Sequence, residues 1–338
     1  MDGMTDGELL GQMVLLGFYG TADMPKEVWE LYNKYRVGGV MLFGWNVKTF
    51  DQTKKMLATI NGKNPFPALP MFIGIDEEGG IVHRLPWKPG TRTAATLGKR
   101  NKPQEVYDQF LRVGQKLRET GVNINLAPVL DIAPDTEGTF MGRRMYGTDP
   151  DKVIPLVTEA IRGTRDGGVL SFGKHFPGHG NTATDSHETL PVINDSAARI
   201  RDYTLKPFEA AIENGIDGLL VGHLLVPALD KKNPASLSKA IITDLLREEL
   251  GFQGIVISDD MRMGAITSKY NIGEACVRFV EAGGDIVFVG KFIDKQRKAL
   301  EALTKAVESG RITRDRLEDS ARRIVRLKLR LLNGGEEQ

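Results

Sequence analysis

The sequence predicts an α/β protein whose single domain is a (β/α)8 TIM-type barrel. Short runs of strand-forming apolar residues recur along the 338 residues, and amphipathic segments separate them. The runs are nearly continuous in hydrophobicity, which is typical of parallel strands buried on both faces. Polar residues gather at the carboxyl-terminal ends of these runs, where barrels of this class carry their functional side chains.

The eight expected strands share this apolar character. In chain order they cover residues 12–18, 37–43, 71–76, 123–132, 170–176, 218–223, 255–260 and 285–290.

Amphipathic helices are expected between the strands. Residues 103–120 begin with a proline and place four apolar side chains on one stripe, namely Val106, Phe110, Val113 and Leu117. Residues 239–250 lie between Ser238, an expected N-cap, and Gly251, an expected C-cap. Residues 313–332 form a closing amphipathic helix.

The competing architecture is an open, doubly wound sheet. No Gly-x-Gly-x-x-Gly follows the first apolar run, so the nucleotide-binding version of that sheet has little support. We find no linker, low-complexity segment or internal repeat. We therefore expect residues 1–338 to form one barrel domain, without a second α/β domain.

The composition is that of an ordinary globular protein, with 41% hydrophobic and 26% charged residues. The net charge of +1 gives no indication of a nucleic-acid partner, and no apolar run is long enough to span a membrane. The single cysteine, Cys276, excludes an intramolecular disulfide. The polar, acidic start indicates a cytoplasmic protein, although secretion or a lipid anchor stays compatible with a chain whose export signal has been removed.

Residues 174–187 are the most informative segment: Lys-His-Phe-Pro-Gly-His-Gly-Asn-Thr-Ala-Thr-Asp-Ser-His. Three of the five histidines lie here. Pro177, Gly178 and Gly180 exclude a long helix, so we expect a strand end that runs into a loop. Ionisable side chains that cluster on a loop are typical of an active site.

Within this segment, Asp185 and His187 are two residues apart. In an extended loop they share a face, so the carboxylate could orient the imidazole as a general acid/base. The alternative is an Asx-turn with a surface histidine. A second candidate carboxylate, Asp259, ends the apolar run at 255–258 and is followed by Asp260. Adjacent strand residues point to opposite faces, so we expect Asp259 to face a substrate and Asp260 to cap the next helix.

The remaining strand ends carry donors and acceptors that suit sugar hydroxyls, carboxylates or phosphates: Asp76, Asp131, Lys174 with His175, and His223. Arg144 could hold such a group by two parallel hydrogen bonds, or could be a solvated loop arginine. A metal reading is also open, because His175, His179, Asp185 and His187 could ligate zinc.

Taken together, these segments resemble glycoside hydrolase family 3 in its β-N-acetylhexosaminidase branch. The resemblance spans essentially the whole chain, and the 174–187 loop is its most specific part. The other matching stretches are Gly38 to Phe43, Ile75 to Gly80 with Val82, Arg84 and Leu85, Asn125 to Asp131, and Pro234 to Ser238 through Gly251-Phe252-Gln253-Gly254 to Asp260.

The resemblance implies roles by position. Asp259 matches the nucleophile, and His187, oriented by Asp185, matches the acid/base. The matched sugar-binding positions are Asp76, Arg84, Arg144, Lys174 and His175, while His223 and Met263 lie on matched segments. One departure is Arg144-Met145-Tyr146-Gly147, where the family usually has Arg-Ser-Phe-Gly.

The implied activity is that of a retaining exo-β-N-acetylglucosaminidase that works by double displacement, without a cofactor or a metal ion. The expected substrates are small carbohydrates, either peptidoglycan fragments such as muropeptides or chitin oligosaccharides. Three alternatives follow from the same residues. They are a zinc-dependent hydrolase using His175, His179 and His187, a β-N-acetylglucosaminide phosphorylase on the same fold, and a non-catalytic sugar-binding barrel.

Overall fold

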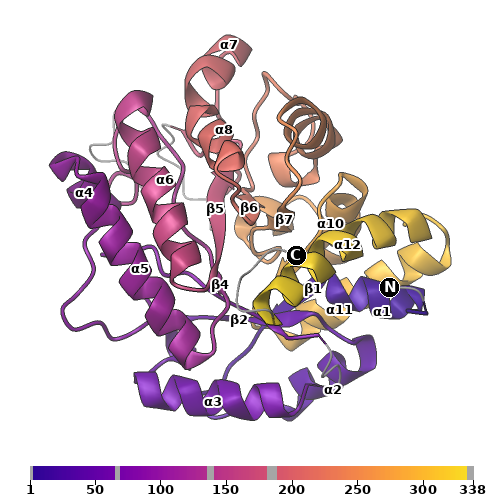
Figure 1. Ribbon diagram of the computed structural model, residues 1–338. Helices are drawn as coiled ribbons and strands as arrows, with labels where there is room; N and C mark the ends of the chain where they lie inside the picture. The colour runs from indigo at the N-terminus through magenta and orange to yellow at the C-terminus, as the bar shows by residue number, and fades with distance from the viewer. Residues whose placement is uncertain (1–2, 65–68, 135–140, 181–188, 333–338) are drawn as a thin grey trace.

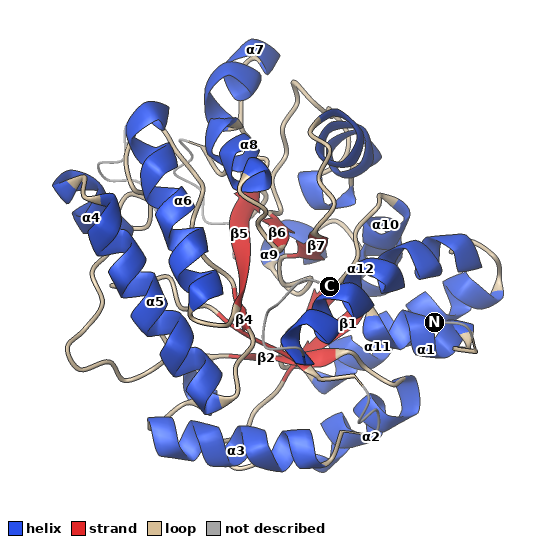
Figure 2. Ribbon diagram, viewed as in Figure 1, coloured by secondary structure: helices blue, strands red, loops and turns tan. Residues whose placement is uncertain are grey.

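The computed structural model describes residues 3–64, 69–134, 141–180 and 189–332 (Figure 1). Eight parallel strands form one sheet in the order β7-β6-β5-β4-β3-β2-β1-β8. A parallel bridge between Ile257 and Ile286 joins β7 to the residues that precede β8 and closes the sheet. The strands lie in the centre and the helices surround them (Figure 2). The predicted (β/α)8 barrel is thus confirmed.

All eight strands are buried along their length, which explains their continuous hydrophobicity. They are β1 (Val14–Gly17), β2 (Gly39–Leu42), β3 (Phe72–Ile75), β4 (Ile124–Asn125), β5 (Leu170–Phe176), β6 (Gly218–Val221), β7 (Ile255–Ser258) and β8 (Val287–Val289).

The outer layer is helical. Its longer helices are α1 (Asp6–Gln12), α2 (Lys26–Tyr35), α3 (Phe50–Gly62), α4 (Ala94–Arg100), α5 (Pro103–Thr120), α6 (Pro150–Asp166), α8 (Lys206–Glu213), η4 (Ala240–Glu249), α10 (Ile272–Glu281), α11 (Ile293–Glu308) and α12 (Arg314–Leu332). Short helical turns are η1 (Gly44–Asn46), α7 (Ala197–Arg199), η2 (Ile200–Thr204), η3 (Ala235–Leu237) and α9 (Gly264–Thr267).

Helix α5 has the bounds that the sequence predicts. Pro103 opens it, and Gly121 ends it in the left-handed conformation at φ 96°. Its predicted apolar stripe is buried. The segment predicted as 239–250 is also helical, with the Ser238 hydroxyl 3.3 Å from the amide of Ile241, but it is wound as a π-type helix. Leu250 accordingly donates to the carbonyl of Leu245.

The strand predicted over 123–132 is shorter in the structure. Regular pairing covers only Ile124–Asn125 of β4, because Pro128 has no amide hydrogen for the ladder. The chain nevertheless stays beside β5, since Lys174 donates to the carbonyl of Pro128 at 3.2 Å and Leu130 donates to that of Lys174 at 2.7 Å. This extended path carries Asp131 to the same rim as the end of β5.

The last helix returns to the first. Arg314 of α12 donates to the Asp6 carboxylate of α1 at 2.5 Å. The buried Asp285 carboxylate, which precedes β8, accepts hydrogen bonds from Ser320 at 2.6 Å and Arg323 at 3.1 Å of α12.

Across the part of the chain that the structure describes, no helix is both long and apolar enough to cross a membrane.

Candidate active site

A cavity of about 780 Å³ opens at the carboxyl-terminal rim of the barrel. Seven of the residues predicted to act in catalysis or to bind a sugar line it, although they come from segments far apart in the chain. They are Asp76, Arg84, Arg144, Lys174, His175, Asp259 and Met263. The strand-end pattern therefore converges on one site, as the barrel topology requires.

A network of ion pairs forms the most buried wall of this cavity. The Lys174 ammonium lies 2.7 Å from the Asp76 carboxylate and 2.6 Å from that of Glu78. Arg144 donates two parallel hydrogen bonds to Glu78, both 2.8 Å long. Arg84 lies 3.5 Å from the second oxygen of Asp76. Three cations thus surround two carboxylates, and their remaining donors and acceptors can hold the hydroxyl groups of a sugar.

The network stays charged despite its burial. Burial alone would raise the pKa of the Glu78 and Asp76 carboxyls, but the nearby Lys174 outweighs it and holds both pKa values below their usual range. Arg144 adds to this effect at Glu78 and Arg84 adds to it at Asp76. Burial similarly opposes protonation of Lys174, yet Asp76 and Glu78 raise its pKa. Mutual pairing therefore offsets the desolvation of each group.

Asp131 organises the histidines behind this wall. One of its oxygens accepts the His175 Nδ1 hydrogen bond at 2.7 Å, and the other accepts the amide of His179 at 2.6 Å. Burial opposes ionisation of Asp131, but His175 keeps the pKa of this carboxyl below its usual value. Burial, helped by the neighbouring His175, lowers the pKa of His179 to about 4, so this ring is neutral near pH 7.

The end of β5 presents two consecutive side chains to the cavity. The register between β5 and β6 shifts between Lys174 and Phe176, which is the irregularity of a β-bulge. A bulge breaks the strict alternation of strand side chains and can re-aim one of them. Lys174 and His175 both line the cavity as a result. The Nε2 atom of His175 then faces the Arg144 guanidinium at 3.4 Å.

Asp259 and Asp260 follow β7 and differ in their partners. One Asp260 oxygen accepts the amides of Arg262 at 3.1 Å and Gly290 at 3.0 Å, and the Arg262 side chain pairs with the same carboxylate. Asp259 accepts the amide of Asp260 at 2.8 Å. It lies at the cavity surface, opposite the ion network in the barrel. Asp260 is therefore the structural member of the pair, and Asp259 is available for chemistry.

Comparison with known proteins places this geometry in a family. A family profile described as "Glycosyl hydrolase family 3 N terminal domain" matches residues 5–327. The chain belongs to glycosyl hydrolase family 3. The family expected from the sequence is thereby confirmed.

Three similar proteins illustrate the relationship. "Beta-hexosaminidase A" of Pseudoalteromonas piscicida is 28% identical over 97% of this chain and 62% of its own length. "Beta-hexosaminidase LpqI" of Mycobacterium tuberculosis is 33% identical over 94% of this chain and 81% of its own. The structure of a family 3 beta-N-acetylglucosaminidase from Paenibacillus sp. superposes with a TM-score of 0.93 at 37% identity, covering 99% of this chain and 64% of that one. This family 3 chain thus covers less than two thirds of the length of two of these relatives, the Pseudoalteromonas and Paenibacillus proteins.

One expected site residue of this family 3 chain, His223, does not reach the cavity, whereas Met263 forms part of its wall. His223 is fully buried behind the cavity, with Nδ1 2.7 Å from the Ser236 hydroxyl and Nε2 3.1 Å from the carbonyl of Asp260. It supports the turn after β7 from behind, and it does not line the cavity. Met263 lies on the cavity wall and is 7% exposed, which suits an apolar contact with a ligand.

The expected acid/base pair, His187 and Asp185, lies outside the described residues. The described chain leads to it directly, because β5, His175 and His179 come just before it in sequence. The departure at Arg144-Met145-Tyr146-Gly147 leaves the Arg144 contacts with Glu78 in place.

The zinc alternative finds no support in the described residues. Among residues 3–64, 69–134, 141–180 and 189–332, no three histidine, cysteine or acidic side chains are grouped as metal ligands. The chemistry of the donor set agrees with this. Nδ1 of His175 bonds Asp131, and Nε2 faces the positive Arg144, which would repel a metal cation at that nitrogen.

Glu78 is the principal site residue that the sequence analysis missed. Of the two adjacent glutamates after β3, Glu77 turns away and accepts the amides of Arg84 and Leu85 and the Trp87 indole N–H, the last at 2.6 Å. Glu78 shares the cavity face with Asp76. Their spacing of two residues is the signal that could have identified Glu78, because alternate residues of an extended chain point the same way.

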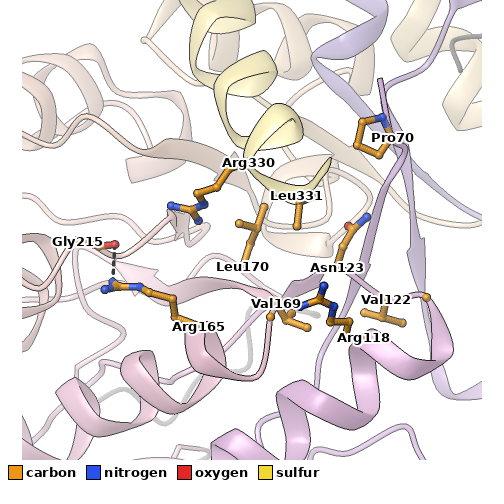
Figure 3. A pocket seen from close by; sticks show the side chains of 12 residues that line it. Pro70, Arg118, Val122, Asn123, Arg165, Val169, Leu170, Gly215, Arg330 and Leu331 are labelled. Carbon is orange, nitrogen blue, oxygen red and sulfur yellow. Dashed lines mark hydrogen bonds between the residues drawn. The ribbon is translucent and has the colours of Figure 1, made fainter. Parts of the chain in front are cut away.

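A second cavity, of about 570 Å³, lies at the opposite end of the barrel (Figure 3). It is bordered by residues that precede β3 to β6, such as Pro70, Asn123 and Gly215. Its arginines join structural elements: Arg165 donates to the carbonyl of Gly215 at 3.0 Å, and Arg330 pairs with Asp217. Barrel active sites form at the other end, so the ion-lined cavity is the candidate active site.

Proposed function

We propose that this family 3 protein is a retaining exo-β-N-acetylglucosaminidase. One observation carries the proposal: a strand-end carboxylate, Asp259, faces a cavity whose opposite wall is a buried network of ion pairs around Lys174. This arrangement fits an enzyme that fixes one sugar by its hydroxyl groups and attacks its anomeric carbon. The names of the relatives support the N-acetylhexosaminide class.

The proposed first step is the formation of a glycosyl ester. The anionic Asp259 attacks the anomeric carbon, and the bond from that carbon to the leaving oxygen breaks. His187 donates a proton to that oxygen, so the aglycone leaves as a neutral alcohol. Asp185 would hold one ring nitrogen of His187 and thereby orient the other toward the leaving group.

The second step reverses these roles. His187, now neutral, takes a proton from water, and the water oxygen attacks the anomeric carbon from the face that the aglycone left. The ester bond to Asp259 breaks, and the sugar is released with retained configuration. A neutral base does not repel an anionic acceptor, so the assay must also determine whether phosphate replaces water.

The inner site contributes by orientation. The hydrogen bonds within the ion network hold the Lys174 ammonium and the Arg144 guanidinium in fixed positions before any sugar binds. Prior positioning lowers the entropic cost of reaching the transition state. A wall that binds the free hydroxyl groups of one sugar suits the last sugar of a chain, so we expect the enzyme to remove a terminal N-acetylglucosamine. We expect peptidoglycan fragments or chitin oligosaccharides to supply it.

The test compares two neighbouring variants, Asp259→Asn and Asp260→Asn. Release of nitrophenol from its β-N-acetylglucosaminide should be abolished in Asp259→Asn while the melting temperature stays near that of the wild type. Asp260→Asn should show the opposite pattern, because the uncharged amide loses the ion pair with Arg262: a lower melting temperature with turnover retained in the folded fraction.

The same assay separates the alternatives. Wild-type turnover should be unaffected by excess EDTA and should give the free sugar in phosphate buffer. Loss of turnover on chelation would favour the zinc-dependent hydrolase, and formation of a sugar 1-phosphate would identify a phosphorylase. A wild type that releases no nitrophenol would contradict the proposed activity.

A further inference from the structure

Glu77 is a buried carboxylate that the proposed mechanism does not use. Its side chain is fully buried, although Glu77 stands in the chain between two residues that line the active-site cavity, Asp76 and Glu78. Among the described residues, no lysine or arginine forms an ion pair with Glu77. A buried carboxylate without a counter-charge is costly, so other groups must stabilise it. The partners of Glu77 therefore indicate its role.

These partners all lie on the loop that follows the cavity residues. One oxygen of Glu77 accepts the amides of Arg84 at 2.9 Å and Leu85 at 3.1 Å, and the other accepts the indole N–H of Trp87 at 2.6 Å. All three partners are donors, which suits an ionised carboxylate because it can only accept. The three hydrogen bonds hold residues 84–87, which we call the Arg84 loop, close to the end of β3.

The barrel in turn holds Glu77. Asn125, the last residue of β4, accepts the amide of Glu77 at 3.0 Å and donates to its carbonyl at 3.0 Å. Asn125 is itself fully buried. Because both sides of its main chain are tied to β4, Glu77 is a fixed point from which its carboxylate can hold the Arg84 loop.

Arg84 is the residue of this loop that lines the cavity, and its side chain is weakly held. Its guanidinium lies 3.5 Å from the Asp76 carboxylate and 3.5 Å from the carbonyl of His83. Its Nε atom is buried and has no hydrogen-bond partner in the part of the chain that the structure describes. Arg144, by contrast, makes two hydrogen bonds of 2.8 Å. Long contacts are weak, so the main chain that Glu77 holds determines where the Arg84 guanidinium lies.

We infer that Glu77 is a positioning residue, which sets the place of the Arg84 guanidinium in the cavity by holding the main chain of the Arg84 loop. The inference rests on the proposed function, in which Arg84 binds the sugar. Glu77 does not line the cavity. It acts on the sugar only through Arg84, so substitution of Glu77 should affect catalysis only while Arg84 is present.

The experiment is a double-mutant cycle of Glu77→Gln and Arg84→Met, with kcat and KM measured on nitrophenyl β-N-acetylglucosaminide. In either orientation, the NH₂ group of the glutamine faces a donor. Glu77→Gln alone should therefore lower kcat/KM about 10- to 100-fold, through the same parameter, KM or kcat, that Arg84→Met changes. In the Arg84→Met background, the same substitution should lower kcat/KM by less than about twofold.

Two outcomes of the cycle would overturn the inference. Equal losses from Glu77→Gln in both backgrounds would show a general structural role that does not pass through Arg84. Wild-type kinetics in Arg84→Met would remove Arg84 from the sugar site, and the role of Glu77 with it.

A rescue variant and a control accompany the cycle. Trp87→Phe removes the indole donor and keeps a ring beside Phe50, with which Trp87 is in edge contact. Added to Glu77→Gln, it should recover about threefold or more of the lost kcat/KM, because the glutamine oxygen can still accept both backbone amides. Absence of any recovery would contradict the assigned hydrogen bonds. Glu209→Gln, on the outer helix α8, should leave the kinetics unchanged.

Hydrogen exchange gives a readout that does not depend on activity. Peptides that cover residues 79–87 should exchange faster in Glu77→Gln than in the wild type, and at the wild-type rate in Arg84→Met and Glu209→Gln. Unchanged exchange in Glu77→Gln would overturn its role in holding the Arg84 loop. A wild type that releases no nitrophenol would instead overturn the glycosidase proposal, and the exchange rates would still decide whether Glu77 holds the loop.

Discussion

Replacing Glu78 by glutamine tests whether the buried ion network is one cooperative unit. One Glu78 oxygen accepts from both Arg144, at 2.8 Å, and Lys174, at 2.6 Å, and the other accepts from Arg144 at 2.8 Å. A glutamine keeps one acceptor oxygen but turns an NH₂ group toward a guanidinium that can only donate. Two buried cations would then lose their shared counter-charge. Removal of one partner from a buried pair costs about 3–5 kcal/mol, so we expect Glu78→Gln to lose that much unfolding free energy.

Urea unfolding supplies the measurement, with Glu209→Gln as the matched control. Glu209 makes a surface ion pair with Lys206 at 2.9 Å, and the same substitution there should cost about 0–1 kcal/mol. The catalytic readout is nitrophenyl glycoside turnover, which should fall on the order of 100-fold in kcat/KM because Lys174 and Arg144 lose their fixed positions. If the two variants lost equal stability, the network would not be the cooperative unit described above.

The pH dependence of the same variant gives an independent test. The folded-state pKa of Glu78 lies below its unfolded value of 4.5, so the ionised carboxylate stabilises the fold above pH 4.5. This contribution is lost as the pH falls below 4.5 toward the folded-state pKa. The stability difference between wild type and Glu78→Gln should therefore be largest near pH 7 and shrink on acidification. A difference that is constant with pH would contradict the assigned direction of the pKa shift.

Three further predictions address other parts of the molecule. Burial lowers the pKa of Lys328 from 10.5 to about 7, so between these two pH values the unfolded chain binds more protons than the folded one. The free energy of unfolding should therefore rise with pH, on the order of 1 kcal/mol per pH unit. Lys328→Met should lose this rise when unfolding is measured at pH 7 and at pH 9. Asp131→Asn should lower kcat/KM about tenfold or more, because an amide cannot replace the charged acceptor shared by His175 and His179, and a wild-type value would count against this positioning role. His187→Ala should lose most activity on glycosides with poor leaving groups and far less on activated phenols; equal losses would exclude His187 as the acid/base.

The fold was predictable because its main determinant is local. Each strand is a short buried run, and each helix between them has an apolar stripe and recognisable ends, as Pro103 and Gly121 show for α5. The misjudged details depend on features that span several elements. Regular pairing in β4 stops early because of Pro128, and the winding of η4 could not be read from its caps.

The candidate site was predictable where a polar residue ends an apolar run, as at Asp76, Lys174 and Asp259. The site was less predictable where the orientation of a side chain depends on residues that are far away in the sequence. Glu78 faces the cavity because it forms ion pairs there with Arg144 and Lys174. The exposed aromatic side chains of Tyr19, Trp45 and Phe292 likewise come from loops after β1, β2 and β8, and no single stretch of sequence predicts that they lie near one another.

The most direct test of the central proposal is to trap the glycosyl ester on Asp259. A fluorinated N-acetylglucosaminide analogue that forms the ester faster than it is hydrolysed would be mixed with the wild-type protein, and peptide mass spectrometry would locate the added sugar. We predict one glycosyl unit per chain on the peptide that contains Asp259, and no adduct in Asp259→Asn. An adduct on another residue, or a wild type that hydrolyses substrate but never acquires an adduct, would contradict Asp259 as the nucleophile.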